Sequence, residues 1–214
     1  MTEDALERAL ARGAGHDDDR PLPDISHAAA SAGLLDVAYA TLASPLGTLL
    51  LACTDRGLVR LAYVGERAEH EDAVLEELAS AISPRVLASP RRLDDPRREL
   101  DQYFAGARHD FDLPLDWQLT HGFGRRVLQA TARIPYGAVS SYKEVAAEAG
   151  SPRGFRAAGN ALGSNPIPIV VPCHRVLHSG GGLGGYTGGL ERKRALLAVE
   201  RGAAGGRAGH TVVM

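Results

Sequence analysis

Cysteine is scarce in this sequence: Cys53 and Cys173 are the two cysteines among 214 residues. They lie in unlike surroundings, so we expect free thiols in a reducing compartment instead of a disulfide framework. Cys53 belongs to the apolar run LGTLLLACT and is predicted to be a small buried hydrophobe. The nearest upstream histidines, His16 and His27, lie at no spacing typical of zinc ligands. We therefore expect neither a structural metal nor a cofactor.

Long hydrophobic runs are also lacking. No apolar stretch approaches the roughly 20 residues of a membrane-spanning helix. The acidic N-terminus has neither the basic start nor the apolar centre of a secretion signal. The 214 residues are 44% hydrophobic and 23% charged, which is typical of a globular protein of one or two compact units. We expect a cytoplasmic monomer of two small domains, with no membrane partner.

Acidic residues are scarce in the C-terminal half. Residues 119–201 carry 11 Lys and Arg against four Glu, a balance of +7, whereas residues 1–118 carry 12 Lys and Arg against 22 Asp and Glu, a balance of −10. The formal net charge of −2 hides this division. Such asymmetry is typical of a polyanion-binding module attached to an acidic partner domain. The C-terminal half is therefore the candidate nucleic-acid-binding part.

The N-terminal half divides into an extension and an α/β domain. Residues 1–35 are rich in Gly, Pro, Asp and Ala, and are predicted to be a flexible extension. Within 36–118, the stretches VAYATLAS, GTLLLACT and GLVRLAYV are separated by the turn signals SPLG and DRG. This pattern predicts a small antiparallel sheet of three strands. AEHEDAVLEELASAI and DDPRRELDQYFAG predict two helices that pack on it.

The C-terminal half, 119–202, is predicted to be mainly helical, with 203–214 as a tail. GFGRRVLQATARI has its apolar residues on one helical face. Next, SSYKEVAAEAG and FRAAGNALG form two short helices around the Gly/Pro break AGSPRG. That outline fits a DNA-binding helix-turn-helix, and an ordinary helical hairpin is the alternative. The basic charge of this half favours DNA.

The second of these short helices is unusual for a base reader. Its face consists of small residues, Ala157, Ala158, Gly159 and Ala161. These side chains are too short to make bidentate base contacts across a wide major groove, but they allow close approach to a narrow groove. Arg156, at the start of the helix, would then project into the duplex.

The candidate nucleophile is Cys173, in the run PIVVPCHRV. A thiol attacks as thiolate, and a free cysteine with a pKa of about 8.5 is mostly protonated at neutral pH. His174 is the obvious group to take the proton. Because adjacent side chains in an extended segment point to opposite faces, contact between the two requires a turn or a bridging water.

A histidine base works better when a carboxylate holds its other nitrogen. The basic half offers Glu144, Glu148, Glu191 and Glu200, and we choose Glu200 because it closes the apolar-faced helix LERKRALLAVE that must pack on the core. Between the thiol and this helix lies the glycine-rich segment LHSGGGLGGYTGGL. It is either a flexible linker or a loop whose backbone amides and single tyrosine close over a flat ligand.

These residues carry a specific resemblance. NPIPIVVPCHRV and GGYTGGLERKRALLAVE, preceded by SSYKEVAAEAG and RAAGNALG, resemble the signature of the O6-alkylguanine-DNA alkyltransferases, or methylated-DNA–protein-cysteine methyltransferases. The resemblance is strong over 119–202 and weak, in strand order, over 36–118. It implies a ribonuclease-H-like N-terminal domain, a winged helix-turn-helix-like C-terminal domain, and double-stranded DNA as partner. The implied activity is single-turnover repair, in which a cysteine takes the alkyl group from guanine O6, with thymine O4 as a second substrate atom.

The resemblance also implies roles for individual residues. Cys173 would accept the alkyl group, His174 would relay its proton through water, and Glu200 would hold the histidine. Asn165 would tie the helix-turn-helix to the active-site strand, and Tyr142 would assist the leaving guanine. Substrate would contact Tyr186, Thr187 and Val176, while DNA would contact Arg156, which fills the vacated stack, together with Tyr142, Ala157, Gly159 and Arg153. The zinc ligands of some relatives are absent.

Three rival interpretations use parts of the same pattern. A Cys–His hydrolase would share the nucleophile but turn over repeatedly and leave the helix-turn-helix unexplained. A lesion-binding sensor related to the alkyltransferases would bind DNA without an acceptor cysteine, which Cys173 argues against. A transcriptional regulator would need longer base-reading side chains on its second helix.

Overall fold

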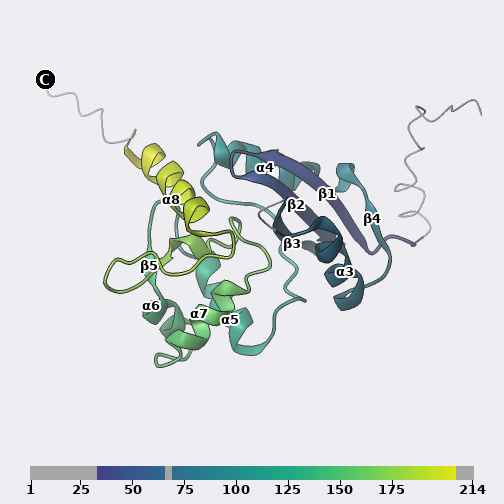
Figure 1. Cartoon of the computed structure of the whole chain (residues 1–214). Helices are drawn as coiled ribbons and strands as arrows, with labels where there is room; N and C mark the ends of the chain where they lie inside the picture. Colours follow the sequence, from purple (N-terminus) through teal and green to yellow (C-terminus); the bar gives the residue numbers. More distant parts are fainter. Residues whose placement is uncertain (1–32, 66–68, 206–214) are drawn as a thin grey trace, which may run out of the picture.

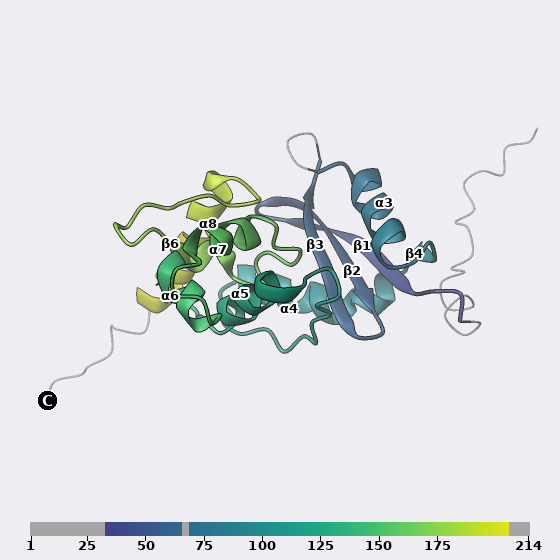
Figure 2. The same cartoon turned by 90° about the horizontal axis from the view of Figure 1, so that it is seen from below.

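A computed structural model of the protein describes residues 33–65 and 69–205 (Figure 1). The chain forms two halves that lie side by side: a sheet with two flanking helices, and a cluster of helices and loops (Figures 1 and 2). The predicted boundary at residue 118 lies in the connection between residues 104 and 122. The expected extension at 1–35 lies outside the described residues except for its last three positions.

The N-terminal half contains the predicted meander of β1 (Val37–Ser44), β2 (Gly47–Thr54) and β3 (Gly57–Val64). The strands are antiparallel, and two-residue turns join them. A fourth strand, β4 (Val86–Ala88), pairs parallel with β1 and gives the sheet order β3-β2-β1-β4. The expected three-stranded sheet is therefore a mixed sheet of four strands. β4 has only three residues, too few to show an apolar alternation in the sequence.

Helices cover both faces of this sheet (Figure 2). Helix α3 (Glu71–Ala81) buries Val74 and Leu78 against one face. On the other face, η1 (Pro90–Leu93) leads into α4 (Asp94–Phe104), which buries Leu100 and Tyr103. This second core continues without a break into the C-terminal half. Burial of apolar area here contributes to the stability of both halves at about 25 cal/mol per Å².

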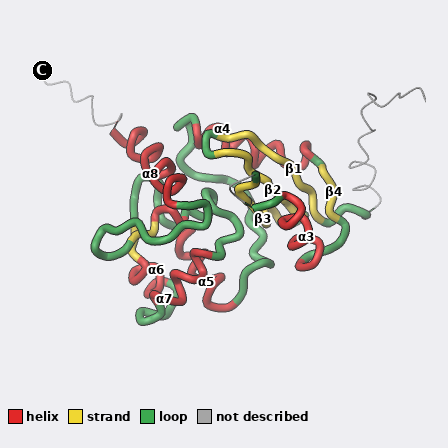
Figure 3. The backbone as a smooth tube through the Cα atoms, in the orientation of Figure 1, coloured by secondary structure: helices red, strands yellow, loops and turns green. Residues whose placement is uncertain are grey.

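The C-terminal half is helical, with one small two-stranded sheet (Figure 3). Helix α5 (Gly122–Ala132) packs against the pair α6 (Tyr142–Glu148) and α7 (Phe155–Gly163). Ser141 and Glu144 form a capping box that fixes the start of α6. The short strands β5 (Ser140–Ser141) and β6 (Val176–Leu177) pair in parallel and flank the turn η2 (Cys173–Arg175). Helix α8 (Leu190–Gly205) completes the fold and runs three residues into the predicted tail.

Strand β3 lies at the edge of the sheet, and the chain itself covers that edge. Leu58 donates its N–H to the carbonyl of Pro114 at 2.8 Å, and Leu61 donates to the carbonyl of Pro166 at 2.8 Å. Gly57 has a φ of +131°, and a Cβ there would clash with the Pro114 carbonyl. The Leu61–Pro166 bond thus joins the N-terminal sheet to the segment that precedes the candidate nucleophile.

Two negative findings apply to residues 33–65 and 69–205. No helix in these ranges is both long enough and apolar enough to cross a membrane. The same ranges contain no group of three or more His, Cys, Asp or Glu side chains placed to hold a metal ion.

Candidate active site

Cys173 begins the one-turn helix η2 and is 4% exposed. Its Sγ atom accepts a hydrogen bond from Asn165 Nδ2 at 3.2 Å, and its N–H donates to the carbonyl of Val171 at 2.8 Å. The turn therefore replaces the extended segment in which Cys173 and His174 would face opposite ways. Both side chains are buried, as a shared site requires.

Asn165 holds the segment before the nucleophile at two points. Its Oδ1 accepts from the N–H of Ile167 at 3.1 Å, and its Nδ2 also donates to the carbonyl of Val171 at 2.9 Å. Between these points, Ile169 is fully buried and has a φ of +74°, the left-handed region that a β-branched residue seldom adopts. The asparagine side chain thus stabilises a strained loop and at the same time contacts the thiol.

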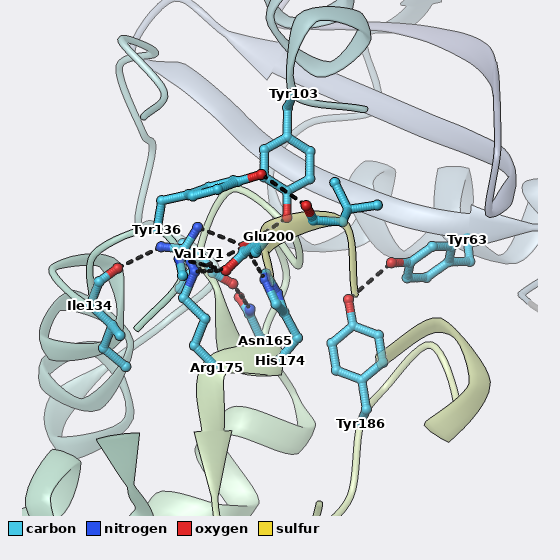
Figure 4. Close-up of polar contacts among 12 residues, drawn as sticks. Tyr63, Tyr103, Ile134, Tyr136, Asn165, Val171, His174, Arg175, Tyr186 and Glu200 are labelled. Carbon is cyan, nitrogen blue, oxygen red and sulfur yellow. Dashed lines mark hydrogen bonds and ion pairs between the residues drawn. The ribbon is translucent and has the colours of Figure 1, made fainter. Parts of the chain in front are cut away.

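His174 and Glu200 form a direct pair. His174 Nε2 lies 2.8 Å from Glu200 Oε1 (Figure 4). Because an ionised carboxylate only accepts hydrogen bonds, Nε2 carries the proton of the neutral imidazole. Nδ1 is then the acceptor nitrogen, and it is buried with no hydrogen-bond partner among the described residues. Of the four glutamates in the basic half, Glu200 is the one that we chose from the sequence, and it is the one that contacts His174.

Glu200 lies at the centre of a larger network (Figure 4). Its carboxylate also accepts from the Tyr103 hydroxyl at 2.8 Å, from the Arg175 guanidinium at 2.9 and 3.1 Å, and from the N–H of Gly137 at 3.1 Å. Burial alone would raise the pKa of Glu200, but the hydrogen bonds from His174 and Arg175 outweigh it and lower the pKa to about 2. The carboxylate is therefore ionised at neutral pH.

Burial also sets the protonation of the other two groups. It lowers the pKa of His174, although the hydrogen bond to Glu200 opposes the fall, so the imidazole is neutral at pH 7. It raises the pKa of the Cys173 thiol to about 11, although the Asn165 hydrogen bond and the Lys193 charge favour the thiolate. The flanking residues of Cys173 led us to expect a reactive thiol. In the free protein the thiol is protonated, so a base must take its proton during the reaction.

Lys193 is a fully buried cation in this site that sequence reasoning missed. Its ammonium group donates to the carbonyls of Val176 at 2.7 Å, Gly185 at 3.3 Å and Leu183. These bonds use the three donors of the side chain and anchor the glycine-rich loop to β6. Burial lowers the pKa of Lys193 to about 8. Its position two helical turns before Glu200 on α8 was the available signal, because residues at that spacing share a helical face.

The glycine-rich loop and α7 enclose a cavity of about 470 Å³. The predicted Tyr142, Arg156, Gly159, Tyr186 and Thr187 all line it. Thr187 donates its hydroxyl to the carbonyl of Gly163 at 2.9 Å, so the loop is fastened to the end of α7. Because the loop lines a cavity and is fastened at both sides, it is not a loose linker.

Three other predicted residues lie elsewhere. Arg153 and Ala157 are exposed and are not among the residues that line the cavity. Val176 is fully buried in β6 and is not among the residues that line the cavity. The substrate contact of Val176 stays a prediction; its carbonyl accepts a hydrogen bond from Lys193.

Residues from the N-terminal half also reach the site. Tyr103, on α4, is fully buried and bonds Glu200, while the Tyr63 hydroxyl, on β3, lies 2.9 Å from the Tyr186 hydroxyl (Figure 4). Neither belongs to the motif around Cys173, and no local pattern identifies them. Together with the helix pair α6–α7, the site defines a cysteine-nucleophile protein built on a helix-turn-helix.

Comparison with known proteins agrees with this class. Residues 37–117 match the ribonuclease-like domain of 6-O-methylguanine DNA methyltransferase, and residues 122–202 match its DNA-binding domain. The chain belongs to this family. The methylated-DNA–protein-cysteine methyltransferase of Mycolicibacterium paratuberculosis is 42% identical over 77% of this chain and 93% of that protein. The constitutive methylated-DNA–protein-cysteine methyltransferase of Bacillus subtilis is 38% identical over 76% of this chain and 94% of that protein. A crystal structure of Mycobacterium tuberculosis OGT in complex with DNA aligns with a TM-score of 0.66 at 38% identity, over 78% of this chain and 94% of that one.

Proposed function

We propose that the protein repairs O6-alkylguanine in double-stranded DNA by moving the alkyl group to Cys173. The observation that carries the proposal is the chain of contacts from Asn165 through the thiol turn to His174 and Glu200. Family membership supports it, since the matching relatives are named for transfer from methylated DNA to a protein cysteine. The cytoplasmic location and the monomeric state expected from the sequence stay predictions.

The chemistry begins with a protonated thiol and a neutral imidazole. We infer that a water molecule carries the Cys173 proton to His174 Nδ1, the buried nitrogen with no protein partner in the described chain. Glu200 stabilises the imidazolium that results, because the carboxylate is ionised and lies 2.8 Å from Nε2. Lys193 and Asn165 stabilise the thiolate, the first through its charge and the second through its N–H.

The thiolate then displaces guanine from the alkyl carbon. The Sγ–C bond forms as the C–O6 bond breaks, and the electron pair of that bond leaves with guanine, which takes up one proton in balance with the proton that Cys173 gave to His174. Tyr142, on the wall of the cavity and with burial raising the pKa of its hydroxyl, is a neutral phenol that can donate to the departing base. The thioether on Cys173 has no proton to exchange and no hydrolysable bond, so each protein molecule reacts once.

Access to the alkyl group requires eversion of the nucleotide. The O6 substituent is enclosed within a stacked duplex, and extruding a base costs a few kcal/mol. Arg156 is exposed at the start of α7, on the rim of the cavity that would receive the base. In our proposal it fills the vacated stack, while exposed Ala157 and half-buried Gly159 let the helix approach the minor groove closely.

Intact-mass spectrometry tests the proposal. After incubation with a duplex that contains O6-methylguanine, the protein should gain the mass of one methylene group, and peptide mapping should place it on Cys173. A Cys173→Ala variant should show no gain, and a Cys53→Ala variant should gain as the parent does. An unmodified protein that nevertheless releases demethylated DNA would indicate a hydrolase. Tight lesion binding without transfer by the parent would indicate a sensor.

A further inference from the structure

We propose that Tyr63, a residue of the N-terminal domain, is a positioning residue for alkyl transfer because it fixes Tyr186 over the active site. The inference rests on the proposed function and assigns a part in it to the ribonuclease-like domain. It is carried by contacts of Tyr63 with three residues of the C-terminal half.

The first contact is a hydrogen bond between phenols. Tyr63 is the second-last residue of β3 and is 4% exposed. Its hydroxyl lies 2.9 Å from the hydroxyl of Tyr186 (Figure 4). The rings meet edge to face, with centroids 6.3 Å apart and an interplanar angle of 68°. Among the described residues, Tyr63 is the one hydrogen-bond partner of the Tyr186 hydroxyl. Its loss would leave a half-buried phenol with an unsatisfied polar end.

The second contact is with Gly188, two residues after Tyr186. Gly188 is buried, and a Cβ added there would lie 2.5 Å from Cε2 of Tyr63. The tyrosine ring therefore forms a wall against which the loop backbone packs directly. Any side chain at this position would push the loop away from β3.

The third contact is between the Tyr63 ring and Arg192. The Arg192 guanidinium lies 4.5 Å from the centroid of the Tyr63 ring, a cation–π distance. Arg192 also donates to the carbonyl of Leu46 at 2.8 Å and to that of Gly188 at 2.9 Å. The arginine thus ties the loop, the β1–β2 turn and the Tyr63 ring together, so the ring has little freedom to move.

These contacts act on the catalytic group through Tyr186. The Tyr186 ring stands edge-on to the His174 imidazole, with centroids 6.4 Å apart and an angle of 88°, and it lines the cavity. A phenol held at its hydroxyl keeps one ring orientation, and a substrate covered by that ring is held close to Sγ. If the alkyl carbon is displaced from Sγ by a fraction of an ångström, the rate of transfer falls more than the affinity of the protein for the duplex does.

The test compares Tyr63→Phe with the parent. This change keeps the ring and its packing and removes only the hydroxyl. We expect the first-order rate constant of methyl transfer, measured with saturating duplex, to fall about tenfold. Affinity for the same duplex, measured in a Cys173→Ala background to prevent transfer, should stay within about twofold. A merely structural residue would lower thermal stability without separating rate from affinity.

Tyr186→Phe and the double variant complete the cycle. Each removes the same hydrogen bond, so the double variant should be no slower than the slower single variant. Tyr39→Phe is the control: Tyr39 is half-buried on β1 and packs against the other core, that of α3, so its transfer rate should equal the parent's. A parental rate for Tyr63→Phe, or effects that multiply in the double variant, would overturn the inference. Failure of the parent itself to accept a methyl group would instead overturn the proposed function, and this inference with it.

Discussion

The carboxylate of Glu200 lies between the His174 imidazole, 2.8 Å from Nε2, and the Arg175 guanidinium, 2.9 Å from its nearest nitrogen, and both Glu200 and His174 are at most 1% exposed. The buried Glu200 carboxylate therefore neutralises the Arg175 guanidinium and also holds the His174 imidazole, the proposed base. Because the guanidinium stays charged at every physiological pH, the carboxylate is ionised before any proton reaches His174. Catalysis and stability should consequently respond together when Glu200 is changed.

Glu200→Gln should impair both properties. The amide cannot neutralise Arg175, and removal of one partner from a buried pair costs about 3–5 kcal/mol. Its NH₂ group can donate to Nε2, which moves the imidazole proton to Nδ1 and abolishes the base, so transfer should slow by about 10²–10⁴-fold. Chemical denaturation and single-turnover kinetics measure the two effects. Glu148→Gln, which breaks an exposed pair with Arg133, should cost at most about 1 kcal/mol and leave the rate unchanged.

Stability should fall in two stages as the pH is lowered. The folded pKa of His174 is lowered, so the unfolded chain binds its proton first and stability declines below about pH 6.5. The folded pKa of Glu200 is about 2, so its contribution is complete above the unfolded value of about 4.3 and is lost as the pH falls through about 2. Unfolding free energies measured between pH 8 and 3 check both stages. His174→Gln should lack the first stage and Glu200→Gln the second; identical slopes in all three proteins would contradict this assignment.

The Cys173 thiol should react slowly with iodoacetamide in the free protein. Its pKa is about 11, so the labelling rate should rise about tenfold per pH unit between pH 7 and 10. Lys193→Met removes the charge that favours the thiolate and should slow labelling at pH 7, and the difference from the parent should shrink above the Lys193 pKa of about 8. Peptide mapping separates Cys173 from Cys53, whose pKa burial raises to about 12. Labelling of Cys173 at pH 7 as fast as an exposed thiol would contradict the prediction.

Asn165→Ala should loosen the strained loop before the nucleophile. The variant loses the two hydrogen bonds that flank Ile169 and the one to Sγ, and leaves the N–H of Ile167 buried without its partner. We expect about 2–4 kcal/mol of destabilisation and slower transfer. Differential scanning calorimetry measures the first and methyl-transfer kinetics the second. Ser164→Ala, which removes an exposed hydroxyl one residue earlier, is the control and should change neither by much.

Arg156→Ala should slow repair of duplex DNA while sparing reaction with the free base O6-benzylguanine. The side chain is proposed to offset the cost of eversion, which a free base does not incur. We expect at least a tenfold loss on duplex, which corresponds to about 1.4 kcal/mol. Arg91→Ala alters net charge equally at an exposed site of the N-terminal domain and should repair duplex at the parental rate. Equal losses on both substrates would show that Arg156 acts on the site instead of the DNA.

Some parts of the site follow from local sequence. Cys173 and His174 are adjacent and Glu200 closes an amphipathic helix, so motif and periodicity suggest them, whereas Asn165 was predicted from the family resemblance alone. The helix pair α6–α7 follows from a Gly/Pro break between two short apolar patterns. The meander follows from alternating apolar runs and turn residues, and all of these elements are confirmed.

What the sequence does not predict depends on contacts between distant residues. Strand β4 is defined only by its pairing with β1. Tyr63 and Tyr103 reach the site because the two halves share one core, and nothing near either residue in the chain indicates this. The protonated state of Cys173 likewise results from burial, which the polar neighbours in the motif conceal. Val176 is fully buried in β6, and its predicted contact with substrate stays a prediction.

The covered edge of β3 affects whether the N-terminal domain can be expressed without the C-terminal domain. An apolar strand with free N–H and C=O groups recruits strands from other molecules, which leads to aggregation. In this chain the N–H of Leu58 donates to the carbonyl of Pro114, and the N–H of Leu61 donates to the carbonyl of Pro166 in the C-terminal half. Residues 37–117 expressed alone would keep the Pro114 contact and lose the Pro166 contact, which would leave the edge of β3 at Leu61 open to pairing with strands of other molecules.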